Sequence, residues 1–236
     1  GTPLYVDQTN NRVGVNKTPT VALDVSGGVT YTGDLASSTS GTSNFRAGVN
    51  AGNTIASGGN YNTVVGDEAG TAISTGDANV AMGYQALATE DAHGTNSAIG
   101  YQSLKTLNAG ADSHNTAVGY ISGVSITSGI QNTIVGSGVG DALTDADFNV
   151  AMGYQSLTTD TKGNRTTAIG FESLKTQNFT SSTDSNNTAV GNRSGALVTT
   201  GVNNTLIGSF AGDGIDAGGN NTAVGKGALG GSVANG

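Results

Sequence analysis

Apolar residues recur along this chain at a fixed step, inside a short motif that ends in glycine. The motif consists of Asn, Thr, a small apolar residue, a larger apolar residue and Gly, as at residues 115–119 and 187–191. Seven of the ten steps between motif glycines are 17 residues long; these glycines lie at positions 48, 66, 83, 100, 119, 136, 153, 170, 191, 208 and 225. Because a constant period is typical of a solenoid, we expect about eleven coils over residues 44–236 and a separate segment over residues 1–43.

The residues within each repeat favour strands and turns over helices. A 17-residue step is shorter than the common helical repeats of about 33 to 47 residues. Glycine accounts for 39 of the 236 residues, and each one costs about 1 kcal/mol inside a helix. The positions three and one before each motif Gly point to one side of a strand, and intervals such as 74–77 favour turns. The predicted fold is all-β, a parallel β-solenoid whose coils each hold two short strands and two turns.

Stacking should place equivalent residues of successive coils above one another, about 4.8 Å apart. We expect the Asn column to form a ladder of side-chain amides, the residue before the Gly to form the buried ridge, and the Gly to provide either positive φ or close backbone approach. These structural columns are represented by Asn115, Val118, Gly119, Asn187, Val190 and Gly191.

The residue two before each motif Gly is usually Ala, and period-two alternation would place it opposite the expected ridge. A flat face of small residues suits close packing against another copy of the chain. Every fourth coil carries a larger residue in this column, and we interpret Val64, Ile134 and Leu206 as knobs directed at a partner subunit. A solvent-exposed face is the alternative.

Four residues after the Gly, pairs of Gly alternate with pairs of Leu, so four coils form a higher repeat.

Residues 1–43 do not follow the 17-residue step. Strand-like stretches lie at 4–7, 12–15, 20–25 and 29–31, and Gly27-Gly28 is a turn signal between the last two. The Ser- and Thr-rich residues 35–43 are expected to form a linker.

Charge and composition exclude several functions. The chain has 17 Asp and Glu against 9 Lys and Arg, a net charge of −8, which disfavours nucleic-acid binding. The absence of cysteine excludes disulfides, thiolate zinc sites and thiol nucleophiles. No apolar run reaches the roughly 18 residues of a membrane span, so we expect no membrane insertion by this segment. Residues 1–4 do not have the pattern of a signal peptide.

Candidate metal ligands are few. His93 and His114 lie in adjacent coils but in different columns, so solvated turn positions are favoured over a paired-histidine metal site. Asp141, Asp145 and Asp147 lie in one turn region and suit calcium, but the regular nonapeptide pattern of calcium-binding β-rolls is missing. We favour turn capping for them, and expect no metal and no cofactor.

Candidate catalytic residues are also few. Glu68, Glu90 and Glu172 do not pair with a second carboxylate, so we expect no glycosidase site and no enzyme activity. The Tyr and Phe residues after the motif Gly suit either sugar stacking or the cover of a coil edge or subunit seam, and we favour the cover. The Thr column raises an ice-binding face, which we disfavour because no regular Thr-x-Thr pair occurs and alternation directs this Thr to the expected core side.

Two repeats are longer than the others, and their extra residues follow Lys105 and Lys175 at the same phase of the four-coil repeat. Loops on a rigid scaffold often carry recognition, whereas tolerated surface insertion is the alternative. The candidate receptor contacts are Lys105, Asn108, Asp112, His114, Lys175, Phe179 and Asp184.

The repeats resemble those of two groups of fibrous proteins. The Asn-Thr-Ala-Val-Gly and Asn-Ser-Ala-Ile-Gly units resemble repeats in the heads of trimeric autotransporter adhesins, which are left-handed parallel β-rolls with three chains per fibre. The units with Tyr-Gln-Ser-Leu after the Gly, at 101–104 and 154–157, resemble repeats in bacteriophage tail fibres. Residues 12–27 are similar to a segment common in those fibres.

This resemblance implies a non-enzymatic homotrimer that forms part of an extracellular fibre. Its partners would be two further copies of the chain and a host cell-surface receptor, with a glycan as one candidate. The N-terminal segment favours a virion tail fibre, and the head of a bacterial surface adhesin is the alternative.

Overall fold

The computed structural model describes residues 4–9, 12–15, 23–25 and 39–231. The chain divides into two compact units, Gly1–Leu35 and Ala36–Gly236. The division falls before the expected boundary at residue 43, because the end of the expected linker already bonds to the next coil. The Thr42 N–H donates to Asn60 Oδ1 at 2.8 Å, so the residues around it belong to the solenoid.

The first unit holds a small mixed sheet of three strands, β1 (Leu4–Asp7), β2 (Arg12–Val15) and β3 (Leu23–Val25). Strand β1 is antiparallel to β2, and β2 is parallel to β3. The expected strands at 4–7 and 12–15 are confirmed, and the one at 20–25 is present over its described part. The expected turn at Gly27-Gly28 and strand at 29–31 lie outside the described residues.

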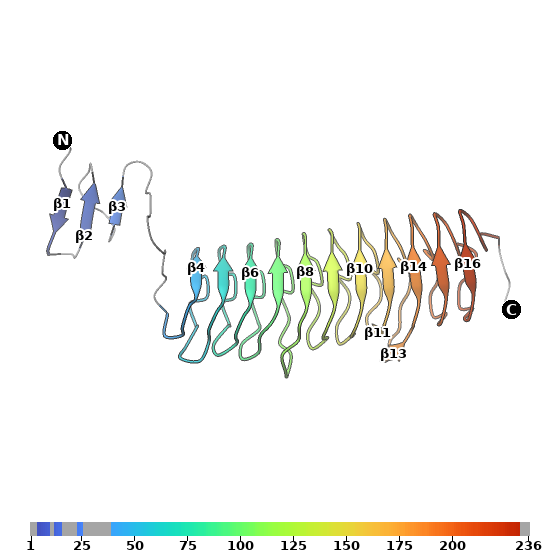
Figure 1. The fold of residues 1–236 in the computed structure, drawn as a ribbon, viewed down its shortest axis with the longest axis horizontal. Helices are drawn as coiled ribbons and strands as arrows, with labels where there is room; N and C mark the ends of the chain where they lie inside the picture. The colour runs from blue at the N-terminus through green and yellow to red at the C-terminus, as the bar shows by residue number, and fades with distance from the viewer. Residues whose placement is uncertain (1–3, 10–11, 16–22, 26–38, 232–236) are drawn as a thin grey trace. The chain divides into compact units, whose positions relative to one another are not determined.

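The second unit is a stack of coils in which each coil contributes one strand to a single parallel sheet of 11 strands (Figure 1). Neighbouring strands pair in register, so that motif residues of successive coils face one another, as Ala117 does with Ala98 and Ile134. The strands of this sheet are β4 (Phe45–Ala47), β5 (Thr63–Val65), β6 (Val80–Met82), β7 (Ser97–Ile99), β8 (Thr116–Val118), β9 (Thr133–Val135), β10 (Val150–Met152), β12 (Thr167–Ile169), β14 (Thr188–Val190), β15 (Thr205–Ile207) and β16 (Thr222–Val224). The predicted all-β parallel solenoid with a 17-residue step is therefore confirmed.

The expected second strand of each coil is not formed in the part of the chain that the structure describes. Within residues 39–231, the only strands that pair outside the main sheet are β11 (Gly163–Asn164) and β13 (Thr183–Asp184), which are short and parallel. The remaining walls are turns whose residues two and four after the motif Gly have positive φ, as in Gln102 (54°) and Leu104 (48°). These left-handed residues close a coil within few residues, so no room remains for a second strand. None of the described residues lies in a helix able to cross a membrane.

The two sides of the strands are the reverse of the expectation. The residue two before the motif Gly points into the coil: Ala81, Ala98 and Ala117 are fully buried. The column immediately before the Gly, expected as the buried ridge, lies outside, and Met82 and Ile99 are 41% and 36% exposed. A shift of one residue exchanges the faces of a strand, so the expected ridge and the expected outer face change places. Val118 and Val190 are accordingly only half-buried.

The knobs expected towards a partner are core residues, since Val64, Ile134 and Leu206 have no exposed surface. Small residues face inwards because large side chains reach the core from the opposite wall of the coil. In six coils an aliphatic residue stands seven positions after the motif Gly and the position four after is Gly; the coil of Gly100, with Leu104 and Leu107, is an exception. A Cβ on Gly140 would lie 2.9 Å from Leu143 Cδ1 and 3.3 Å from Ile134 Cδ1. The alternation of Gly and Leu pairs is therefore a pattern of volume complementarity.

The position of Ile134 leads to a prediction for core packing. Ile134→Ala should lower the free energy of unfolding by about 3 to 4 kcal/mol, because the rigid coil cannot collapse around the cavity. Leu197→Ala is the control, since Leu197 is 48% exposed, and it should change stability by less than about 1 kcal/mol. Chemical denaturation of both variants measures the difference. Equal effects would contradict the inward position of Ile134.

The Asn column forms the expected ladder. The Asn132 N–H donates to Asn115 Oδ1 at 2.9 Å, and the Asn149 N–H donates to Asn132 Oδ1 at 2.9 Å. Most of the Asn amides also bind a main-chain carbonyl of the next coil, as Asn132 Nδ2 does at the Ala146 carbonyl, 2.8 Å away, whereas Asn96 Nδ2 binds the Gly94 carbonyl of its own coil. These side chains are buried, so the ladder satisfies polar groups that water does not reach.

Candidate functional site

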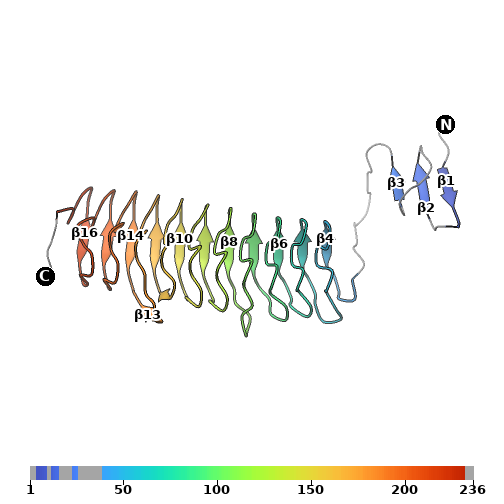
Figure 2. The same ribbon diagram turned by 180° about the vertical axis from the view of Figure 1, so that it is seen from behind.

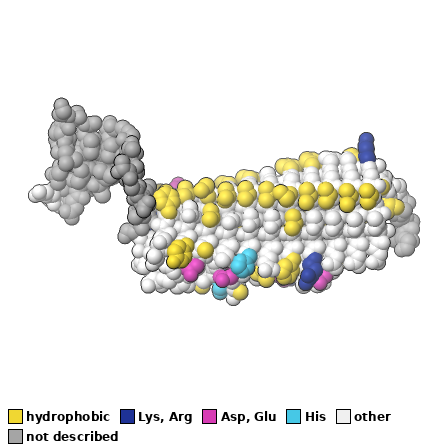
Figure 3. All heavy atoms as spheres, viewed as in Figure 1, with side chains coloured by type: hydrophobic (Ala, Val, Ile, Leu, Met, Phe, Trp, Pro, Cys, Tyr) yellow, Lys and Arg dark blue, Asp and Glu magenta, His cyan; other side chains and the backbone are white. Residues whose placement is uncertain are grey.

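The outer side of the 11-stranded sheet is a regular surface, because its strands pair in register from coil to coil. We call it the sheet face and define it by the residues three and one before each motif Gly. These residues are Thr, Ser, Val, Ala, Ile, Met and one Phe, so no charged side chain belongs to the face. In Figure 3 a hydrophobic stripe crosses the described solenoid, and the charged side chains visible in this view lie outside it. The face is thus uncharged along its length and partly apolar.

The outward position of the Thr column removes one argument made from the sequence. Thr116 and Thr133 are half-buried beside Val118 and Val135 on the outer side, not against the core. The orientation expected to disfavour an ice-binding face is therefore wrong, whereas the regular Thr-x-Thr pair is still absent from the sequence.

An aromatic column borders the sheet face at the residue after the motif Gly. The rings of Tyr84 and Tyr101 stack with centroids 5.4 Å apart, and Tyr101 and Tyr120 stack at 5.3 Å. Tyr154 and Phe171 form a second stack at 5.7 Å. Because the rings cover one another's faces, they present mainly edges to solvent. This arrangement supports the preferred interpretation of a coil-edge or seam cover over sugar stacking.

The two long loops leave the same edge of the stack, at coils four steps apart (Figures 1 and 2). Four steps correspond to about 19 Å, so the structure does not gather the seven candidate contacts into one site. In the first loop, Asn108, Asp112 and His114 are exposed and Lys105 is half-buried. Asp112 is partly committed to the fold, because its Oδ1 accepts the Gly94 N–H at 2.9 Å.

The second loop is tied to the coil more firmly. Phe179, expected as a contact residue, is only 6% exposed and packs inwards. Asp184 lies in β13 and its Oδ2 is 3.1 Å from Arg165 Nε, and Lys175 Nζ is 2.7 Å from Glu172 Oε1. The loop tip at residues 180–182 remains exposed. The surface available to a receptor is therefore smaller than the sequence suggested.

The three aspartates considered for calcium do not converge. Each of Asp141, Asp145 and Asp147 is bound by a different donor. The donors are the Thr158 hydroxyl, the Lys162 ammonium and the Ile130 N–H. Only Asp147 caps a main-chain N–H, whereas Asp141 and Asp145 bind side chains of the next coil, and the three carboxylates have no common partner.

The burial of two carboxylates, Glu90 and Asp160, was not predicted from the sequence. Glu90 and Asp160 have no exposed surface, and both lie seven residues after a motif Gly, where most other coils have Ile, Leu or Val and one has Gln177. Each supports the base of a long loop in the following coil: Glu90 Oε2 accepts the Ala109 N–H at 3.3 Å, and Asp160 Oδ1 accepts the Phe179 N–H at 3.0 Å. An acidic residue in a mainly aliphatic column is the sequence signal that identifies both.

Burial raises the pKa of Glu90 above its usual value, and the N–H groups of Ala109 and His93 only partly offset this effect. A folded-state pKa above the unfolded value means that the stabilising contribution is complete at pH values below the unfolded pKa, and is lost as the pH rises through the folded pKa. Glu90→Gln should therefore gain stability relative to the unsubstituted chain as the pH rises from about 4 to neutrality. Chemical denaturation of both proteins at several pH values measures this trend, with a chelator in the buffer so that no metal ion binds to the carboxylate. A stability difference that does not change with pH would contradict it.

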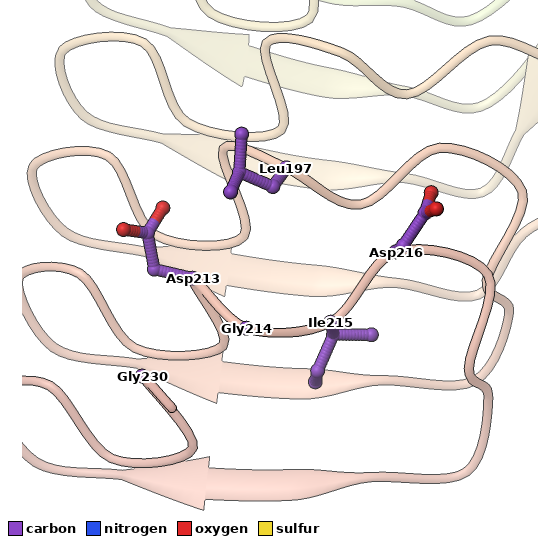
Figure 4. A pocket seen from close by; sticks show the side chains of 6 residues that line it. All are labelled: Leu197, Asp213, Gly214, Ile215, Asp216 and Gly230. Carbon is purple, nitrogen blue, oxygen red and sulfur yellow. The ribbon is translucent and has the colours of Figure 1, made fainter. Parts of the chain in front are cut away.

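A shallow pocket of about 290 Å³ lies near the last described coils, lined by Leu197, Asp213, Gly214, Ile215, Asp216 and Gly230. Figure 4 shows its two carboxylates at opposite ends of the segment, directed away from each other.

Comparison with protein-family models, with curated proteins and with solved structures finds no match.

Proposed function

We propose that the chain is a structural, receptor-binding segment of an extracellular homotrimeric fibre, and specifically of a bacteriophage tail fibre that attaches to a host cell. The observation that carries this proposal is the uncharged, partly apolar sheet face that runs along the entire stack of coils. Contiguous apolar patches of a few hundred Å² on a protein surface are often sites of interaction. The likeness of the repeats and of residues 12–27 to tail-fibre sequences supports the phage assignment.

The size of the face indicates how the chains would meet. A strand of three residues is about 10 Å long, and ten steps of about 4.8 Å give a face of roughly 480 Å². A stable interface buries about 800 Å² per partner. The contact therefore needs the adjoining aromatic column as well as the sheet face, and we place both at the seam between subunits. The sequence suggested that the Ala column forms the contact between subunits, but that column is buried within the chain, so the proposed contact lies on the sheet face instead.

Oligomer mass tests the assembly. Sedimentation equilibrium should give three times the chain mass for the unsubstituted protein. Val118→Asp, which places a charge on the sheet face, should shift the protein to monomers because a buried unpaired charge is costly. Ser128→Asp is the control, since Ser128 is exposed on another wall of the solenoid, and it should leave the trimer intact. An unsubstituted protein that sediments as a monomer would overturn the proposed fibre.

Host attachment needs its own test. Fluorescently labelled protein, incubated with a panel of bacterial isolates, should bind a subset of them, and enzymatic removal of surface glycans reports on a glycan receptor. Ala111→Arg combined with Ser181→Arg, which adds bulk and charge at the exposed tip of each long loop, should abolish binding without changing oligomer mass. Binding that survives both replacements would exclude the loops as the contact surface. The head of a bacterial adhesin is the alternative, and sequence flanking this segment in its gene distinguishes a tail-attachment domain from a membrane anchor.

A further inference from the structure

One corner of the solenoid, between β6 and β7, brings together three side chains able to bind a metal ion. Glu90, Asp91 and His93 each offer one ligand atom, and these atoms lie within 4.8 Å of one another. Among the residues that the structure describes, they form the one such group. Glu90 is fully buried, whereas Asp91 is exposed and His93 is half-buried, so the corner has a protein floor and an opening to solvent.

The internal repeat supplies a comparison for this corner, because Asp160 occupies the position of Glu90 one four-coil repeat later. Asp160 accepts the Gly163 and Phe179 N–H groups, and a third bond comes from Gln177 Nε2 at 2.6 Å. Glu90 accepts only the equivalents of the first two, from His93 and Ala109, both at 3.3 Å.

The residue equivalent to Gln177 near Glu90 is Leu107, which is buried and apolar. Glu90 therefore accepts no side-chain hydrogen bond of the kind that Gln177 supplies to Asp160, and its nearest side-chain nitrogen is His93 Nδ1, 3.6 Å from Oε1. A buried carboxylate in this state is costly unless a positive charge is close.

Asp91 and His93 accompany Glu90, which lacks a glutamine partner, and have no counterpart beside Asp160, which is bound by Gln177. His93 and Asp91 correspond to Gly163 and Thr161 in the later repeat. The Nδ1 atom of His93 is shielded from solvent, has no hydrogen-bond partner and lies 3.6 Å from Glu90 Oε1. An imidazole nitrogen without a partner, beside an under-satisfied carboxylate, is the second observation that indicates a ligand here.

Two hydrogen bonds from the preceding coil hold the backbone of this corner in place. The Asp91 carbonyl accepts the Ser74 N–H at 2.7 Å, and the His93 carbonyl accepts Asn79 Nδ2, part of the Asn ladder, at 3.2 Å. The ligating side chains therefore project from a rigid scaffold, and binding would require only small side-chain rotations.

We propose that Glu90, Asp91 and His93 bind a divalent first-row transition-metal ion, with Zn²⁺ as the ion to be tested. One imidazole and two carboxylates match the ligand types of such ions, and the ion supplies the positive charge that the two carboxylates lack. Three protein ligands leave a position open to water. Through the bond from the Ala109 N–H to Glu90, the ion would tie the corner to the base of the first long loop. This inference does not depend on the proposed fibre function.

Calorimetric titration of the untagged, metal-free protein with Zn²⁺ tests the site, and Co²⁺ absorption reports on its coordination. We expect one equivalent per chain and a higher Tm in the presence of the ion. His93→Ala should weaken binding at least about tenfold and abolish the Co²⁺ spectrum. His114→Ala is the matched control, because His114 is exposed and lies outside the group.

Asp91→Asn is a second variant, and folding should not depend on this exposed side chain; it should also weaken binding, while circular dichroism stays unchanged. No binding by the unsubstituted protein, or equal binding by His93→Ala and His114→Ala, would overturn the site.

Discussion

Gly119→Ala is expected to be among the most damaging single substitutions in this chain, with a loss of more than about 4 kcal/mol of stability or of cooperative folding. Gly119 has φ of +135°, a backbone conformation that a residue with Cβ rarely adopts. A Cβ at this position would also lie 2.2 Å from the Gly136 carbonyl oxygen and 2.6 Å from its carbon. These are main-chain atoms of the next coil, so they can move aside only if the stack separates.

Two other glycines separate the causes of this effect. Gly225 has a similar φ of +122°, but an added Cβ would meet nothing within 4 Å, so Gly225→Ala should cost only about 1 to 3 kcal/mol of backbone strain. Gly110 has neither a positive φ nor a contact, and Gly110→Ala should lie within about 0.5 kcal/mol of the unsubstituted protein. Thermal and denaturant unfolding of the three variants measures this order. Similar losses at Gly119 and Gly225 would show that backbone strain, and not the close approach of neighbouring coils, explains the need for Gly at this position.

The period, the parallel register and the Asn ladder could be predicted because each depends on identity between equivalent positions of successive repeats. Asn115 follows Asn96 as the ladder requires, and this is visible in the sequence alone. The turn chemistry was predictable only in part. Glycine marks some left-handed positions, but Gln102 and Leu104 adopt positive φ as well, because the closure of the coil imposes this conformation on any residue there.

Alternation divides the residues of a strand between two faces, but it does not say which face is buried, so the sequence pattern alone could not predict this. Size suggested that Val118 is buried and Ala117 exposed, and the reverse is found. The interior of a coil is filled from the opposite wall, by residues such as Leu104 and Ile126, so the sheet can contribute only small side chains. The volume match between Ile134 and Gly140 was the sequence signal for this arrangement. The partners of Glu90 and Asp160 depend on contacts across coils, which a single repeat does not reveal.

Asn132→Ala should remove about 3 to 5 kcal/mol of stability, because it breaks the ladder in the middle of the stack. The Asn132 side chain accepts the Asn149 N–H at 2.9 Å and donates to the Ala146 carbonyl at 2.8 Å, and it has no exposed surface. The substitution leaves a donor and an acceptor without these partners, at about 1 to 3 kcal/mol each, and adds a small cavity. Urea denaturation gives the value, and Asn192→Ala, at an exposed position, should change it by less than about 0.5 kcal/mol.

The natural interruption of the ladder at Thr166 shows what a tolerated replacement requires. There Gln177 Nε2 donates to Thr166 Oγ1 at 3.1 Å, and Gln177 Oε1 accepts from Asn187 Nδ2 at 2.8 Å, so a second side chain bridges the gap. The equivalent of Gln177 in the coil after Asn132 is the aliphatic Leu143, so no such bridge is available. Asn132→Thr should therefore remain strongly destabilised, and a Thr variant as stable as the unsubstituted protein would mean that the ladder contributes little beyond its main-chain bonds.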